Sequence, residues 1–92
     1  MDKDIVKVNI EGLELELDKA VIDNMELVDA LAEMKDDDDV MSISRVSKMI
    51  FGTHRKKLYD HLRTEKGTVP VEKVSDAIQT TFRALGDSGK NS

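Results

Sequence analysis

Apolar and polar residues alternate at the start of the chain, as they do in half-buried β-strands. β-branched side chains dominate the run Ile5-Val6-Lys7-Val8-Asn9-Ile10, and the run Leu13-Glu14-Leu15-Glu16-Leu17 alternates strictly. Glu11-Gly12 connects the two runs, and a two-residue connection that contains glycine is typical of a tight hairpin turn. We predict an antiparallel β-hairpin with strands near residues 4–10 and 13–18. Its leucine face must pack on other elements, because an isolated hairpin is only marginally stable.

Beyond the hairpin, apolar residues recur at the spacing of amphipathic helices. The first predicted helix spans about 24–35, and the aspartate run Asp36–Asp39 follows it as a loop, since like charges repel and acids suit a helix C-terminus poorly. A second helix begins at a capping serine, Ser42 or Ser44, and ends at Gly52.

Two further helices complete the predicted fold. The third spans about 54–65, between a Thr53 cap and Gly67. The fourth opens near Pro70, which is tolerated in a first helical turn, and ends at Gly86. Its regular apolar stripe predicts a core helix, with these residues buried: Val71, Val74, Ile78, Phe82 and Leu85.

These elements predict an α+β fold in which the N-terminal hairpin packs on about four short α-helices. The chain has 92 residues, which suffice for one hydrophobic core. We predict one domain over residues 1–86 and a flexible polar tail over 87–92, because the tail has no apolar side chain to dock it.

Charge is unevenly distributed along the chain. Residues 1–41 contain fourteen acids and four bases, whereas residues 42–66 contain seven bases and two acids. An acidic front and a basic middle can attract each other within one fold, or between copies as a weak homo-oligomer, or serve only as solvated faces.

Candidate catalytic and metal-binding residues are sparse. The Asp36–Asp39 run lacks the alternating ligands, central glycine and closing glutamate of a calcium loop. His54 and His61 lie about two helical turns apart, and the chain has no cysteine to complete a zinc site. We find no nucleophile–base pair and no glycine-rich phosphate loop. The sequence therefore predicts a protein that is not an enzyme and needs no cofactor. Lacking a signal peptide or membrane span, it is expected in the cytoplasm.

Two kinds of macromolecular partner remain open. Residues 44–63 have the pattern of a helix-turn-helix, with Gly52 between two short helices and bases on the second. Lys48 stands where such motifs hold a small residue, and a net charge of −5 opposes phosphate binding. Met34, Met41 and Met49 instead favour a protein partner, since methionine adapts to varied apolar surfaces, although it also fills core gaps.

The order of elements resembles the short tail assembly chaperone of long-tailed phages and prophages of Gram-positive bacteria. The resemblance covers nearly the whole chain, as a pattern without a sharp motif, and lies in these runs: Val8-Asn9-Ile10-Glu11-Gly12-Leu13-Glu14-Leu15-Glu16-Leu17, Met25-Glu26-Leu27-Val28-Asp29-Ala30-Leu31-Ala32-Glu33, Met49-Ile50-Phe51-Gly52, Leu58-Tyr59-Asp60-His61-Leu62-Arg63, Phe82-Arg83-Ala84-Leu85-Gly86 and Gly89-Lys90-Asn91-Ser92.

The resemblance implies a role similar to that of the lambda-type chaperones. Such proteins bind the apolar, helical tape measure protein and keep it soluble in the host cytoplasm until the tail tube polymerises, and they are not expected in the mature virion. Neither catalysis nor a cofactor is implied. The family has no motif whose residue roles transfer to this chain, so the candidate partner-binding residues are chosen by residue type: Met34, Met41, Met49, Phe51 and Tyr59.

The resemblance also implies a longer, frameshifted product whose extension recruits tail tube protein. Gly89-Lys90-Asn91 can be encoded by GGA AAA AAC, an A-rich sequence on which ribosomes slip. The alternative to the chaperone is a small prophage DNA-binding regulator that uses residues 44–63.

Overall fold

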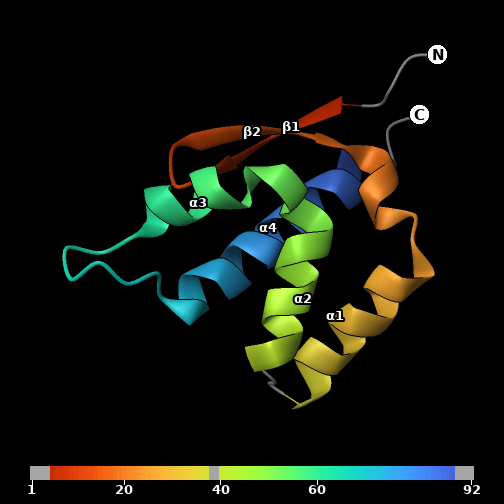
Figure 1. Cartoon of the computed structure of the whole chain (residues 1–92). Helices are drawn as coiled ribbons and strands as arrows, with labels where there is room; N and C mark the ends of the chain where they lie inside the picture. Colours follow the sequence, from red (N-terminus) through yellow and green to blue (C-terminus); the bar gives the residue numbers. More distant parts are fainter. Residues whose placement is uncertain (1–4, 38–39, 89–92) are drawn as a thin grey trace.

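The computed structural model describes residues 5–37 and 40–88 (Figure 1). It contains one two-stranded antiparallel sheet, four α-helices and two short 3-10 helices, and so confirms an α+β fold with an N-terminal hairpin. The elements in chain order are β1 (Ile5–Ile10), β2 (Leu13–Asp18), η1 (Lys19–Ile22), α1 (Met25–Asp37), α2 (Val40–Phe51), η2 (Gly52–His54), α3 (Arg55–Leu62) and α4 (Val71–Ser88).

The hairpin turn uses the two residues that the sequence predicts. Glu11 and Gly12 have φ angles of 51° and 94°, and two consecutive positive φ values are typical of the primed turn that matches strand twist. The Gly12 N–H donates to Asn9 Oδ1 at 2.9 Å, which closes the turn. In the resulting register Val8 pairs with Leu15, so the apolar side chains of both strands share one face.

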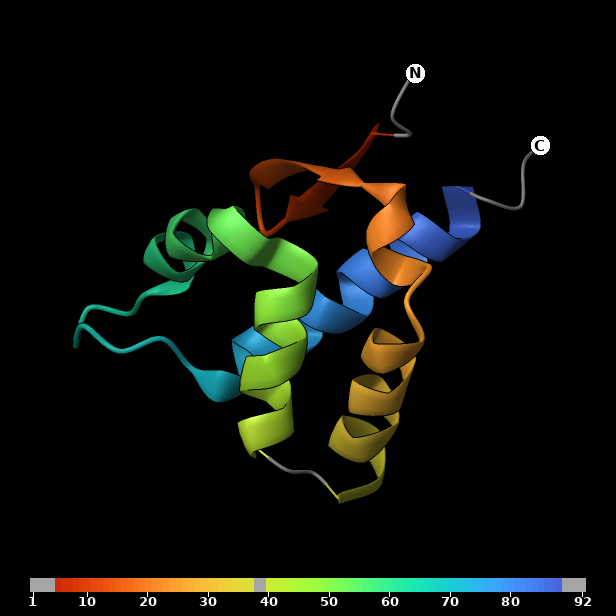
Figure 2. The ribbon, with the colours of Figure 1, turned by 45° about the vertical axis from the view of Figure 1, so that its right-hand side comes forward.

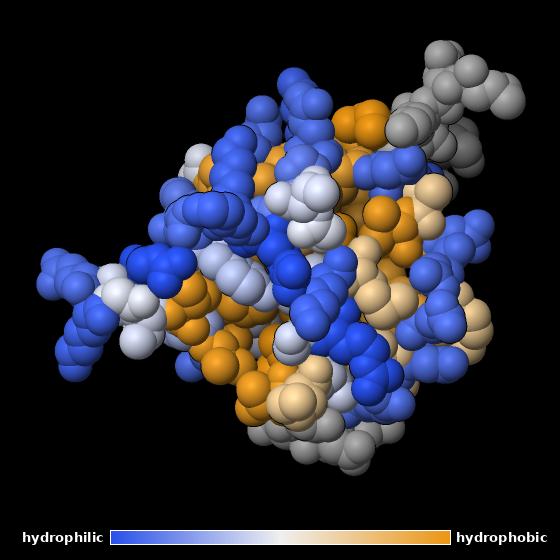
Figure 3. All heavy atoms as spheres, viewed as in Figure 1, coloured by the Kyte–Doolittle hydropathy of each residue, from blue (hydrophilic) through white to orange (hydrophobic). Residues whose placement is uncertain are grey.

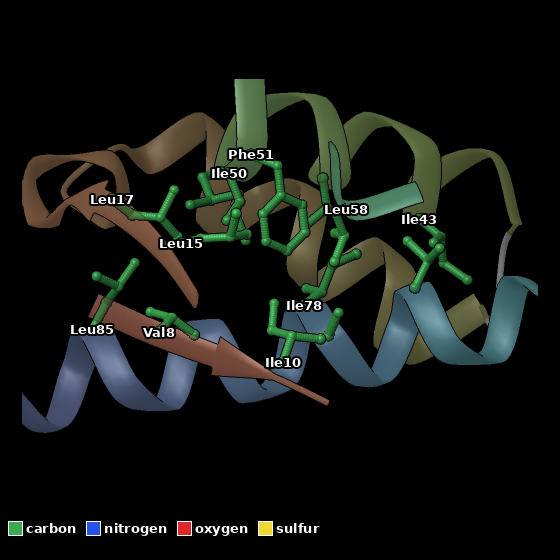
Figure 4. Close-up of a cluster of buried hydrophobic side chains, with 14 of the residues drawn as sticks. Val8, Ile10, Leu15, Leu17, Ile43, Ile50, Phe51, Leu58, Ile78 and Leu85 are labelled. Atoms are coloured by element: carbon green, nitrogen blue, oxygen red, sulfur yellow. The ribbon is translucent and has the colours of Figure 1, made fainter. Parts of the chain in front are cut away.

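The helices cover this apolar face of the hairpin. In Figures 1 and 2 α1 and α2 lie side by side as an antiparallel pair, and α4 crosses behind α2 toward the hairpin. α4 packs against both β1 and α2, which makes it the element that joins the sheet to the helical layer. Figure 4 shows the ring of Phe51 among side chains from the hairpin, α3 and α4.

Phe51 belongs to the core and not to an exposed surface. Its side chain is 1% exposed, and it is the largest fully buried side chain among the described residues. Phe51 was a candidate for the partner-binding surface, and this placement contradicts that prediction. The physical reason is that Phe51 is the last residue of α2, where the hairpin, α3 and α4 converge. Side chains from all three therefore surround its ring.

The buried stripe of α4 differs from the predicted one at two positions, 71 and 82. Val74, Ile78 and Leu85 are buried as predicted, but Thr81 occupies the inner position between them. Phe82 is only half-buried, and the predicted core residue Val71 is 46% exposed at the first turn. The sequence pattern favoured Phe82 because it is apolar, whereas the helical spacing from Ile78 is satisfied equally by position 81.

The ends of α1 and α2 differ from those predicted. α1 continues to Asp37, so the aspartate run is partly helical, while Asp38 and Asp39 lie outside the described residues. α2 begins at Val40, so the predicted caps Ser42 and Ser44 lie inside the helix. η1 was not predicted, and Asp18 caps it by accepting from the Ala20 N–H at 2.9 Å.

The third and fourth predicted helices also change at their ends. α3 has His54 as its N-cap and ends at Leu62, so neither Thr53 nor Gly67 bounds it. Gly67 instead forms a turn in which its N–H donates to the Thr64 carbonyl at 2.9 Å. α4 continues through Gly86 to Ser88, and the rest of the predicted tail, residues 89–92, lies outside the described residues.

We expect Ile78→Ala to cost more stability than Phe82→Ala. Ile78 is fully buried, so its truncation should cost about 2–5 kcal/mol. The half-buried Phe82 ring should cost about 1 kcal/mol, since it loses only part of its transfer free energy and leaves no closed cavity. Urea denaturation of the two variants measures both values, and a greater loss for Phe82→Ala would contradict this placement.

Thr81→Val is expected to stabilise the protein by about 1 kcal/mol, because it replaces an unpaired buried hydroxyl with a methyl group of similar shape. The side chain of Thr81 is buried, and among the described atoms its Oγ1 has no hydrogen-bond partner. Thr80→Val at the neighbouring exposed position is the matched control and should change stability by less than about 0.5 kcal/mol. Thermal unfolding in which Thr81→Val lowers the melting temperature would show that the hydroxyl is satisfied.

Candidate partner-binding site

An open groove of about 620 Å³ lies between α1, α2 and α4. Its apolar floor comes from all three helices and consists of Leu31, Met34, Ile43 and Phe82. Ser75 and Gln79 line the groove from α4, and Lys35 and Arg83 add a positive charge from α1 and α4 respectively. The groove is thus apolar at its base and polar along its edges, which is typical of ligand and peptide sites.

Helical spacing explains why these side chains meet. Leu31, Met34 and Lys35 lie within three and four residues of one another on α1, so they share one face. Ser75, Gln79 and Phe82 follow the same spacing on α4, one position around the helix from its buried stripe. Phe82 is therefore half-buried, because its ring forms part of the groove floor and does not enter the core.

A smaller apolar hollow of about 160 Å³ adjoins the groove. Ile43, in the first half of α2, lines both. Val40 and Val71 are 55% and 46% exposed at the edge of this hollow, and Val69 and Val74 complete its apolar lining. Figure 3 shows apolar atoms gathered at the lower left, where the segment after α3 meets the lower end of α2.

The remaining predicted partner-binding residues are distributed over several surfaces. Met34 lines the groove, and Tyr59 lines the smaller hollow, with its hydroxyl 2.7 Å from Ser47 Oγ. Met41 is 74% exposed in the first turn of α2. Met49 lies half-buried in a separate hollow whose other lining residues are charged, namely Glu26, Asp29, Glu33 and Arg45.

Sequence reasoning missed most of the groove. Phe82 was predicted to lie in the core because of its spacing, and spacing does not distinguish a closed interior from a groove. Gln79 and Arg83 belong to no sequence motif that would indicate a binding site. That Phe82 and Leu31 line one groove depends on how α4 is rotated against α1, which only the packed structure defines.

Opposite charges meet within the fold. Arg45 of the basic middle segment pairs with Glu33 of the acidic front at 3.4 Å. The hairpin turn is held in a similar way, because Lys73 pairs with Glu11 at 3.1 Å and His61 Nε2 lies 2.8 Å from the Glu11 carbonyl oxygen. Part of the charge asymmetry is therefore satisfied inside one chain, and weak self-association stays a prediction.

α2, η2 and α3 form two helices joined by one tight turn, as the helix-turn-helix reading expects. Two basic residues around α3 are already paired, since Lys56 and Arg63 lie 3.3 Å and 2.9 Å from carboxylate oxygens of Asp60. Arg63 also donates to the Gly67 carbonyl at 3.0 Å. Asp60 therefore places a negative charge on the face that would have to meet DNA phosphates, which weakens that reading.

Neither metal binding nor membrane insertion has a visible basis in the described part of the chain. No group of three or more His, Asp or Glu side chains there is arranged to hold a metal ion. Within the same residues, no helix is long and apolar enough to cross a bilayer.

Comparison of the chain with protein-family models, with curated proteins and with solved structures finds no match.

The ion pairs of Asp60 should be visible in its titration. Hydrogen bonds from Arg63 and then Lys56 lower the pKa of Asp60 below its ordinary value of 3.8. Because the pKa is lower in the folded state, these contacts stabilise the protein above the unfolded-state pKa, and their contribution is lost as pH falls through the folded-state pKa. Carboxyl NMR titration should show the Asp60 pKa rising in Arg63→Ala, with Lys57→Ala as the control. An unchanged Asp60 pKa in Arg63→Ala would contradict the assigned contact.

Proposed function

We propose that this protein is a phage tail assembly chaperone that binds an apolar helical segment of the tape measure protein and keeps it soluble before the tail tube polymerises. The observation that carries the proposal is the open groove between α1, α2 and α4, with its floor of Leu31, Met34, Ile43 and Phe82. It acts by binding, without catalysis or a cofactor, in the cytoplasm of a bacterial host.

The shape and lining of the groove fit one common mode of peptide recognition. An amphipathic helix binds by laying its apolar stripe into a hydrophobic groove, with anchors at helical spacing. The adjoining hollow, with Val40 and Val71 exposed at its edge, extends the apolar surface around Ile43. A tape measure protein, being helical and apolar, offers such a stripe repeatedly, so covering it would prevent its aggregation.

The resemblance of the element order to short tail assembly chaperones supports the same partner. A frameshifted longer product that recruits tail tube protein is part of this proposal. Its junction, Gly89-Lys90-Asn91, lies outside the described residues, so this part rests on the sequence alone.

A DNA-binding regulator is the second candidate. The favourable observation is the α2–η2–α3 arrangement, with exposed Lys56 and Lys57 on α3. The pairing of Lys56 with Asp60 and the net charge of −5 oppose it. A gel shift at physiological salt separates the candidates, since the chaperone should leave DNA mobility unchanged.

Co-expression with a phage tape measure protein tests the proposal. We expect wild-type chain to keep the tape measure protein in the soluble fraction and Phe82→Glu to lose that effect, because it places a charge on the apolar floor. Thr80→Glu makes the same charge change on an exposed position of α4 and should behave as wild type.

Circular dichroism of both variants establishes that they remain folded. An insoluble tape measure protein in the presence of folded wild-type chain would contradict the proposed function. A folded Phe82→Glu variant with full activity would show that the partner binds elsewhere.

A further inference from the structure

The charges that line the groove all have the same sign. Lys35 enters from α1 and Arg83 from α4, and no described acidic side chain lines the groove. Neither base forms an ion pair with any described side chain, although Arg45, Lys56, Arg63 and Lys73 all do. Among the described side chains, the apolar floor therefore has one base without an ion pair on α1 and one on α4.

We propose, on the basis of the function above, that the groove selects helices whose apolar stripe is flanked by acidic side chains. When a helix lies with its stripe on the floor, its flanking positions come to the two edges, where Lys35 and Arg83 stand. Glutamate or aspartate there meets a positive charge on each side. The same relation between an apolar seam and its flanking charges sets partner choice in coiled coils.

The selection is local and does not arise from long-range attraction. The chain carries a net charge of −5, which repels an acidic helix at a distance. Discrimination comes at contact, where a basic-flanked helix would place its own lysines against Lys35 and Arg83. Such like-charge contacts reject a wrong partner more effectively than the matching pairs strengthen the right one.

The long stems of the two bases are compatible with an apolar site. Lysine and arginine bury their methylene chains along apolar surface and keep their charged ends in water. The stems of Lys35 and Arg83 thus extend the apolar contact surface around Phe82 and Met34. Their charged ends interact with the side chains that flank the apolar stripe of the bound helix.

Three synthetic helical peptides test the inference. All three have the same leucine stripe, and the positions that flank the stripe are all Glu in the first, all Gln in the second and all Lys in the third. Fluorescence anisotropy with the wild-type chain should give the affinity order Glu, Gln, Lys. The Glu and Lys peptides should differ by about tenfold, since two contacts change from attraction to repulsion. The double variant Lys35→Glu/Arg83→Glu should reverse the order. The matched control is Lys48→Glu/Lys57→Glu, which changes the net charge equally at exposed positions outside the groove, and it should preserve the order.

Equal affinity for the three peptides, no binding of any of them, or an order unchanged in Lys35→Glu/Arg83→Glu would each overturn the inference. Co-expression separates this failure from that of the proposed function. A wild-type chain that keeps the tape measure protein soluble but shows no charge preference retains the function and loses only the selectivity. A wild-type chain that shows the preference but leaves the tape measure protein insoluble retains the selectivity and loses the function.

Discussion

Burial of the hairpin's apolar face is the constraint on which the rest of this structure depends. Two strands cannot stand alone in water, so Val8, Ile10, Leu15 and Leu17 must be covered. α4 covers β1, and the Phe51 ring at the end of α2 fills the space between the hairpin and the helices. This arrangement fixes the rotation of α4 about its own axis, because Ile78 and Leu85 must face inward.

The rotation of α4 in turn creates the groove. With Thr81 inside, Phe82 and Arg83 line the same groove as Leu31, Met34 and Lys35 of α1. One helix therefore serves two purposes, since its inner stripe closes the core and the adjacent stripe remains open to a partner. The groove results from the way in which the helices pack to bury the core, and no separate sequence motif specifies it.

Local patterns predicted the hairpin well, because strict alternation and Glu11-Gly12 leave few alternatives in register and turn. They also predicted that the helices exist, but not where each helix begins and ends. Ser42, for example, was a predicted cap, but its side chain is buried inside α2 and does not lie at the start of the helix. The surface was less predictable. Phe51 and Phe82 look alike in the sequence, and tertiary packing alone places the first in the core and the second in the groove.

Amide NMR can map which residues respond when a helical segment of the tape measure protein is added to the full chain. If the groove binds that segment, shift changes concentrate at Leu31, Ile43, Gln79 and Phe82. Changes confined to Lys56, Lys57 and the rest of α3, or no changes at saturating segment, would contradict binding in the groove.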